Sequence, residues 1–124
     1  MKRILVVDDE AIVRESIRDW LQDAGHQVAV AESGEEALSL VEKEDFSIIV
    51  LDLKLPRMTG IDVLERVRTL KPKIKSVVIT AYPTMLTKDE ASRLGAIDYL
   101  IKPISPETLE RLIRETVVKL EGGE

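Results

Sequence analysis

The pattern of apolar and polar positions predicts strands that alternate with amphipathic helices along the whole chain. Short apolar runs rich in β-branched residues occur at residues 4–7, 27–31, 48–51, 76–79 and 96–101. Between these runs, apolar residues recur at helical spacing. Strands and helices that alternate in this way indicate right-handed βαβ units, with helices on both faces of a parallel sheet. The sequence therefore predicts an α/β fold in three layers around a doubly wound, five-stranded parallel sheet, whose strand order the pattern does not give.

The run Ile48–Leu51 is the expected centre of that sheet. Four consecutive apolar residues indicate a strand buried on both faces. Asp52 follows the strand directly, at the edge where open α/β sheets bind their ligands. An aspartate before a loop that contains proline can also simply open a turn. Asp52 alone therefore does not define a site.

Length and composition narrow the class of protein. A chain of 124 residues fits one domain, and we expect residues 1–121 to form it, with 122–124 as a tail or the start of a linker. The absence of cysteine excludes disulfides and thiolate metal sites. A formal net charge of -5 without a basic tract argues against nucleic acid binding, and no apolar run is long enough for a membrane span. These features predict a cytoplasmic protein that binds neither nucleic acid nor membrane.

Chemically suited side chains follow four of the five expected strands. Asp8 and Asp9 come after the first strand, Asp52 after the third, Thr80 after the fourth and Lys102 after the fifth. Carboxylates gathered at one edge would raise one another's pKa unless a cation neutralised them. Oxygen ligands are those that Mg²⁺ prefers, and a lysine can supply a permanent positive charge. The arrangement indicates a site for a phosphoryl group.

Several segments carry a family resemblance, each at a strand end and all in one order. They are Val7-Asp8-Asp9-Glu10, Leu51-Asp52-Leu53-Lys54-Leu55-Pro56 with Thr59-Gly60, Thr80-Ala81, and the segment 95–103 that ends in Lys102-Pro103. Through them the sequence resembles the receiver domain of two-component response regulators over essentially its whole length. The resemblance implies a flavodoxin-like sheet of order 2-1-3-4-5 and a phosphorylation-activated signalling switch. Self-phosphorylation and autodephosphorylation, both dependent on Mg²⁺, would be its only chemistry.

The resemblance also assigns the phosphoacceptor and the metal ligands. Asp52 would accept a phosphoryl group from the phosphohistidine of a sensor histidine kinase or a phosphotransfer protein. Asp9, Asp52 and the backbone carbonyl of Lys54 would bind Mg²⁺, with Mn²⁺ as an alternative, and Asp8 would act through a bound water.

Further residues would bind the phosphoryl group and respond to it. By resemblance, Lys102, the Thr80 hydroxyl and the Ala81 amide would contact phosphoryl oxygens, and the Lys102-Pro103 bond would be cis. Thr80 would then move toward the phosphoryl group and Tyr99 would turn inward. The face made by the fourth helix, fifth strand and fifth helix would change its partners. This face is a candidate for homodimerisation, and the chain could belong to a longer regulator with a covalently linked output domain.

Two features depart from the common pattern. Pro83 stands where many receivers have glycine, and the capping box Thr87-Lys88-Asp89-Glu90 lies downstream, so we expect a short fourth helix that starts late. The consequence would be a mobile output face. Lys54 and Tyr82 supply no acid to orient an attacking water, and we expect slow self-dephosphorylation.

Three other functions compete with that of a receiver domain. A phosphatase or phosphotransferase of the haloacid-dehalogenase type needs a second aspartate two residues after its nucleophile, where this chain has Lys54. A flavodoxin-like cofactor module needs a phosphate-binding loop after the first strand, where Asp8 and Asp9 stand. A degenerate receiver that only binds other proteins would have no need of the complete set of site residues.

Overall fold

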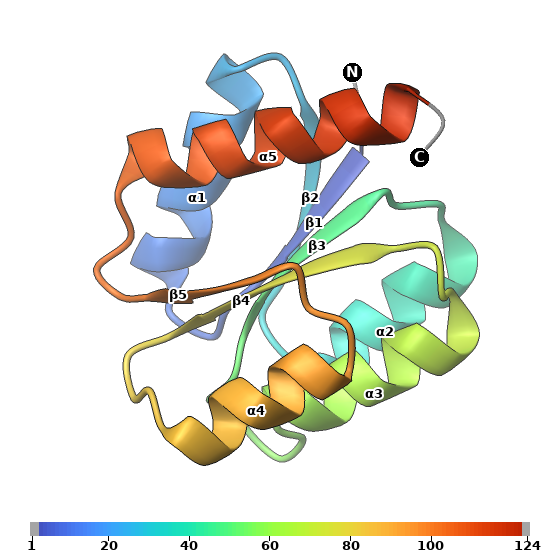
Figure 1. The fold of residues 1–124 in the computed structure, drawn as a ribbon, viewed down its shortest axis with the longest axis vertical. Helices are drawn as coiled ribbons and strands as arrows, with labels where there is room; N and C mark the ends of the chain where they lie inside the picture. The colour runs from blue at the N-terminus through green and yellow to red at the C-terminus, as the bar shows by residue number, and fades with distance from the viewer. Residues whose placement is uncertain (1–2, 123–124) are drawn as a thin grey trace.

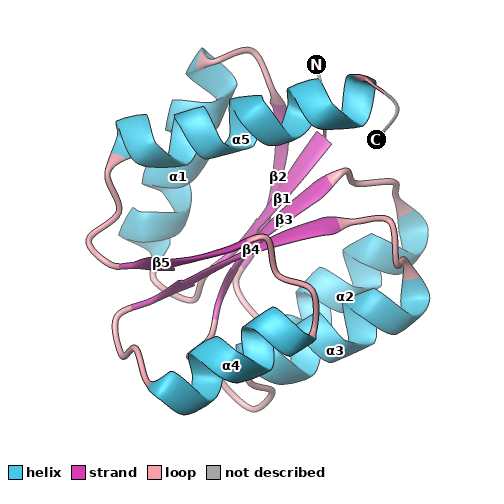
Figure 2. Ribbon diagram, in the orientation of Figure 1, coloured by secondary structure: helices cyan, strands magenta, loops and turns pink. Residues whose placement is uncertain are grey.

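Five strands and five helices alternate in the computed structural model, which describes residues 3–122 (Figures 1 and 2). In chain order they are β1 (Arg3–Val7), α1 (Ala11–Asp23), β2 (Gln27–Ala31), α2 (Gly34–Lys43), β3 (Ile48–Asp52), α3 (Gly60–Leu70), β4 (Lys75–Thr80), α4 (Met85–Arg93), β5 (Asp98–Ile101) and α5 (Pro106–Glu121). The alternation predicted from the hydrophobic pattern is confirmed.

The strands form one parallel sheet in the order β2-β1-β3-β4-β5, as the resemblance implied. The chain moves outward from β1 to β2 and then crosses back to β3, on the other side of β1. This reversal brings the carboxyl ends of β1 and β3 next to each other, with Val7 paired to Leu51. Ligands of open α/β sheets bind at such a point. The topology therefore places Asp8 and Asp52 on neighbouring strand ends.

Helices cover both faces of the sheet and bury two separate apolar clusters. Side chains alternate along β1, so that Ile4 and Val6 pack with α1 and α5, whereas Leu5 and Val7 pack with α2, α3 and α4. In Figure 1, α1 and α5 lie on one side of the strands and the other three helices on the opposite side. Residues 48–51 of β3 are fully buried, as predicted. The central strands therefore form a rigid base for whatever stands at their ends.

The fourth helix begins late and is short, but the predicted capping box does not open it. The helix starts at Met85, two residues after Pro83, and has nine residues. Its N-cap is Thr84, whose side chain accepts a hydrogen bond from the backbone N–H of Thr87. The prediction that Thr87 would cap the helix is therefore wrong. The earlier threonine satisfies a free N–H group equally well and adds a further turn of helix.

The expected domain boundary falls at the end of the described residues. Helix α5 ends at Glu121, and Gly122 is its C-cap. Residues 123 and 124, the rest of the expected tail or linker, lie outside the described residues, as do residues 1 and 2. Among residues 3–122, none of the helices combines the length and the apolar character that crossing a membrane requires.

Candidate functional site

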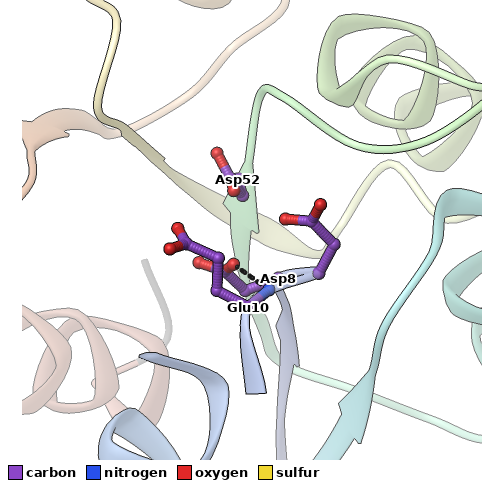
Figure 3. A group of neighbouring side chains, drawn as sticks. Asp8, Glu10 and Asp52 are labelled. Atoms are coloured by element: carbon purple, nitrogen blue, oxygen red, sulfur yellow. Dashed lines mark hydrogen bonds between the residues drawn. The ribbon is translucent and has the colours of Figure 1, made fainter. Parts of the chain in front are cut away.

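The predicted acids and the predicted lysine meet at one edge of the sheet. The Nζ atom of Lys102 lies 2.9 Å from Asp8 Oδ2 and 3.1 Å from Asp52 Oδ2. It also lies 2.9 Å from Glu10 Oε1. Figure 3 shows the carboxylates of Asp8 and Glu10 gathered around the strand end that carries Asp52. One ammonium group thus contacts three carboxylates, two from the segment directly after β1 and one from the end of β3.

Asp52 is the last residue of β3, and only 2% of it is exposed. Its Oδ1 accepts a hydrogen bond from the backbone N–H of Lys54 at 3.2 Å, and its Oδ2 accepts one from Lys102. Burial raises the pKa of Asp52 to about 6, and the charge of Asp8 adds to this effect, while the two hydrogen bonds oppose it. At neutral pH Asp52 is therefore mostly ionised, in surroundings that disfavour its charge.

Asp8 is completely buried and only partly satisfied. Its Oδ1 accepts a hydrogen bond from the backbone N–H of Glu10 at 2.9 Å, marked by the dashed line in Figure 3. Its Oδ2 faces Lys102, but the contact lacks hydrogen-bond geometry, and the atom has no other partner. A buried carboxylate oxygen without a hydrogen bond is costly unless a cation or an ordered water binds it.

Lys102 is held in place by its backbone as well as by its side chain. Its N–H donates a hydrogen bond to the carbonyl of Thr80 at 2.8 Å, and the Lys102-Pro103 peptide is cis, as the resemblance implied. Burial alone would lower the pKa of the ammonium, but the contacts with Asp8, Glu10 and Asp52 outweigh burial and raise it. Lys102 is therefore a permanent cation at this site.

The oxygen atoms at the site fit a divalent cation. One carboxylate oxygen from each of Asp8, Asp9, Glu10 and Asp52 lies within 4.8 Å of the others. Oxygen ligands in this number suit Mg²⁺, which keeps several waters when it binds to proteins. The Oδ2 of Asp8 has an ion pair with Lys102 but no hydrogen bond, and a metal-bound water would supply one. The residues present therefore fit the metal that the sequence predicted.

A cleft of about 260 Å³ opens above these groups. Its lining residues are Asp9, Glu10, Asp52, Lys54, Ala81, Tyr82 and Lys102. Two of the predicted site residues, Asp8 and Thr80, are not part of this lining and are buried. The cleft therefore has room for a small anionic group directly beside the Asp52 carboxylate.

Gly60 explains how the loop after β3 can lie so close to Asp52. A Cβ atom at Gly60 would stand 2.3 Å from the carbonyl oxygen of Asp52 and 2.5 Å from Cα of Leu53. The N–H of Gly60 donates a hydrogen bond to the carbonyl of Leu53 at 2.8 Å. Thr59 caps α3 directly before it with a complete capping box. The motif Thr59-Gly60 thus lets the start of α3 support the backbone that carries Asp52.

The two predicted switch residues, Thr80 and Tyr99, form hydrogen bonds with different partners. Thr80 Oγ1 accepts a hydrogen bond from the N–H of Tyr82 at 3.0 Å. The Tyr99 hydroxyl is 2.8 Å from Thr87 Oγ1 and accepts a 3.4 Å contact from the N–H of Thr84. Tyr99 is half-buried. Its contacts with Thr84 and Thr87 connect its hydroxyl to the first turn of α4 rather than to the cleft.

Two residues of the cleft had no place in the predicted set of site residues. Glu10 contacts Lys102, and Tyr82 stacks with Lys54, whose Nζ lies 4.4 Å from the centre of the Tyr82 ring. The available signal for Glu10 was its position directly after the two aspartates at the strand end. Nothing in the sequence indicated that Tyr82 would meet Lys54.

Comparisons with known proteins agree with this geometry. Residues 4–114 match the response regulator receiver domain family. The alginate biosynthesis transcriptional regulatory protein AlgB of Pseudomonas aeruginosa is 37% identical over 128 residues, which cover 98% of this chain and 28% of that protein. The chain thus spans about a quarter of the length of this relative.

Solved structures share the fold over most or all of the chain. A CheY-like response regulator receiver domain protein from Methanospirillum hungatei JF-1 has a TM-score of 0.96 and 32% identity, with 100% of this chain and 99% of that chain covered. A response regulator from Burkholderia pseudomallei has a TM-score of 0.83 and 31% identity, with 88% of this chain and 64% of that chain covered. That structure contains a phosphorylated aspartic acid and a calcium ion.

These matches cover nearly all of the described residues, and the solved structures share the fold found here. The alternatives of a haloacid-dehalogenase-type enzyme and a flavodoxin-like cofactor module therefore do not apply. The chain belongs to the receiver domain family of two-component response regulators, which are phosphorylation-activated switches.

Proposed function

We propose that Asp52 accepts a phosphoryl group from the phosphohistidine of a sensor histidine kinase or a phosphotransfer protein. The observation that carries the proposal is the Lys102 ammonium, held 3.1 Å from a buried carboxylate that opens into the cleft. An Asp52 oxygen attacks phosphorus and forms the new O–P bond. The N–P bond of the donor breaks, its electron pair stays on the imidazole, and that nitrogen takes up a proton from solvent. Positioning and charge neutralisation do most of the work in such a transfer.

Asp9, Asp52 and the backbone carbonyl of Lys54 would hold Mg²⁺, or Mn²⁺ in its place, and Asp8 would bind a water of the metal. The metal would neutralise charge between the attacking and transferring oxygens. The cluster of carboxylate oxygens within 4.8 Å supports this assignment, as does the calcium ion in the Burkholderia pseudomallei protein.

Lys102, Thr80 and the N–H of Ala81 would receive the oxygens of the transferred phosphoryl group. Lys102 and Ala81 line the cleft. The hydroxyl of Thr80 now accepts a hydrogen bond from the N–H of Tyr82, so it can turn its own proton toward a new acceptor. Its movement is the first step of the proposed switch.

The inward turn of Tyr99 would be the second step of the switch. The face formed by α4, β5 and α5 would then change its binding partners. This face exposes apolar side chains, including Met85 at 83%, Leu86 at 66% and Ile101 at 56%. Apolar residues gathered on one face are typical of a protein interface. The proposed partners of this face are a second copy of the chain and a covalently linked output domain. The relative AlgB is a transcriptional regulatory protein, and the match covers only 28% of its length. The cytoplasmic location expected from the cysteine-free sequence belongs to the same proposal.

The decisive experiment is phosphorylation by a small donor. The purified protein is incubated with acetyl phosphate and Mg²⁺, and addition of one phosphoryl group is followed by intact mass. We expect addition to wild type, none to Asp52→Ala, and undiminished addition to Asp45→Ala, because Asp45 is fully exposed and remote from the cleft. Equal phosphorylation of wild type and Asp52→Ala would overturn the assignment. Oligomeric state with a beryllofluoride mimic, measured by light scattering, tests the proposed dimer.

The phosphoryl group is expected to be lost slowly, because neither Lys54 nor Tyr82 can orient an attacking water as a base. The measurement is the decay of the phosphorylated mass in Mg²⁺ after the donor has been removed. A half-life of seconds would contradict this expectation.

A further inference from the structure

Glu10 is the N-cap residue of α1, yet its side chain makes no capping hydrogen bond. The other four helices in residues 3–122 are each capped by a hydroxyl side chain, from Ser33, Thr59, Thr84 and Ser105. Serine, threonine, aspartate and asparagine are the residues that cap well. In a scaffold that otherwise obeys local rules, a position that breaks one often serves the functional site.

The side chain of Glu10 contacts Lys102 instead of its own helix. The distance from Oε1 to Nζ is 2.9 Å, and the two residues are 92 positions apart in the sequence. Figure 3 places the Glu10 carboxylate beside that of Asp8 at the end of the central strands. The side chain of Glu10 is 61% exposed, whereas those of Asp8 and Asp52 are only 0% and 3% exposed. Glu10 is therefore the only one of the three carboxylates on Lys102 that lies at the rim of the cleft.

Lys102 must change partners when Asp52 reacts. Both oxygens of Asp52 are engaged, Oδ1 by the N–H of Lys54 and Oδ2 by Lys102. One oxygen has to be released before it can bond to phosphorus, and the ammonium must then turn to the incoming phosphoryl oxygens. An ammonium has three donors, so a carboxylate that stays in contact throughout would keep it in the cleft during the exchange. Glu10 is free to follow this movement because its side chain is solvent-exposed.

We propose that Glu10 is a positioning residue, which retains the Lys102 ammonium in the cleft while Lys102 exchanges Asp52 for the phosphoryl group. The inference rests on the proposed function of Asp52. It requires no contact between Glu10 and the phosphoryl group or the metal. It predicts that removing the hydrogen-bond acceptor at position 10 makes the Lys102 ammonium more mobile and, in the same variant, slows phosphorylation.

The test compares wild type, Glu10→Ala, Glu10→Gln and the control Glu15→Ala. Glu15 is an exposed carboxylate of the same helix with no contact to Lys102, so its removal changes the net charge equally. Phosphorylation by acetyl phosphate is measured at a Mg²⁺ concentration high enough that the rate of each variant no longer depends on it. Motion of the Lys102 ammonium is measured by NMR as the order parameter of its ¹⁵N nucleus, in the beryllofluoride-bound protein.

We expect Glu10→Ala to be phosphorylated about threefold more slowly, the size expected for one partly exposed ion pair. The order parameter of the Lys102 ammonium should fall in the same variant. Glu10→Gln keeps an acceptor oxygen and should lie nearer to wild type, and Glu15→Ala should match wild type.

The proposal is overturned if Glu10→Ala reacts at the wild-type rate, or if it reacts more slowly while the Lys102 ammonium stays as ordered as in wild type. The second result would mean that position 10 acts only through its charge. Failure of the proposed function would look different, because wild type itself would then take up no phosphoryl group.

Discussion

The central strands and the α4–β5 edge of the sheet are built in different ways. Residues 4–7 of β1 and all of β3 are buried, and Asp52 stands at the end of this base. Strand β5 has no buried residue, and Ala91 is the only buried residue of α4. The proposed chemistry is thus located on the best-packed part of the molecule and the proposed response on the least packed. A rigid base keeps reacting groups aligned, whereas a weakly packed edge can change its arrangement at little cost in free energy.

Hydroxyl groups replace apolar packing at the weaker edge. The Thr87 hydroxyl contacts Thr84 and Tyr99, and Tyr99 also meets the N–H of Thr84. Each such hydrogen bond contributes only about 1 kcal/mol net. A new acceptor at the cleft could therefore outweigh them, whereas it could not displace the packed core below Asp52.

Gly60→Ala should give the largest effect, because Gly60 packs directly against the backbone at the end of the rigid strand β3. The added Cβ would stand 2.3 Å from the Asp52 carbonyl oxygen, which belongs to a buried strand and cannot move away. We expect a loss of about 3 kcal/mol in the free energy of unfolding, at the upper end for overpacking, measured by urea denaturation. Gly122→Ala is the matched control, since its new Cβ would meet its nearest neighbour at 3.4 Å. Equal stability of the two variants would show that the loop below Asp52 is not rigid.

Asp52→Asn, also at the end of β3, should raise the free energy of unfolding in the absence of divalent metal. Burial and Asp8 raise the pKa of Asp52 from 3.8 to about 6, which corresponds to about 3 kcal/mol at most. The folded protein holds this proton more tightly than the unfolded chain, so wild-type stability falls as pH rises from about 4 to about 6 and is level above that range. Asp52→Asn has no carboxyl group to ionise at this position, so its stability does not fall over this pH range.

Urea denaturation between pH 4 and pH 8 tests this expectation. The stability difference between Asp52→Asn and wild type should grow up to pH 6 and stay constant above it. Saturating Mg²⁺ should shrink the difference, because the metal binds the folded wild type. Asp45→Asn, at a fully exposed carboxylate, should show no such pH dependence. A wild type as stable as Asp52→Asn at pH 7 without metal would mean that the charge of Asp52 costs nothing in the fold.

The sequence predicted the rigid region far better than the edge. The run Ile48–Leu51 and the polar residues after it follow directly from burial on both faces, and the order of the strands came from the family resemblance. The start of α4 was misplaced because Thr87 opens a capping box in the sequence, whereas in the structure Thr84 caps the helix and the Thr87 hydroxyl contacts Tyr99. The contact between Glu10 and Lys102 spans 92 residues, so no local pattern could indicate it.

Thr87→Val tests whether the α4–β5 edge opens independently of the base. The substitution removes the hydroxyl contacts with Thr84 and Tyr99. We expect amide hydrogen exchange in α4 to become about fivefold faster, equivalent to about 1 kcal/mol of local stability, with no change in β1 and β3. Thr69→Val in α3 is the control, because that hydroxyl is exposed and donates only to the Glu65 carbonyl. An equal acceleration in β3 would mean that edge and base unfold together.

Lys54→Met should give the smallest effect, at the border between the two regions. The Lys54 ammonium lies over the Tyr82 ring, and both side chains line the cleft beside Asp52. An exposed contact of this kind contributes about 0.5–1 kcal/mol, so its loss should shorten the lifetime of the phosphoryl group about threefold by admitting water more often. Decay of the phosphorylated mass in Mg²⁺ measures this lifetime. Tyr82→Phe keeps the ring and Lys73→Met removes an exposed lysine away from the cleft, so both should decay like wild type. A lifetime unchanged in Lys54→Met would mean that the stacked pair does not shield the site, and that water reaches the phosphoryl group by another side of the cleft.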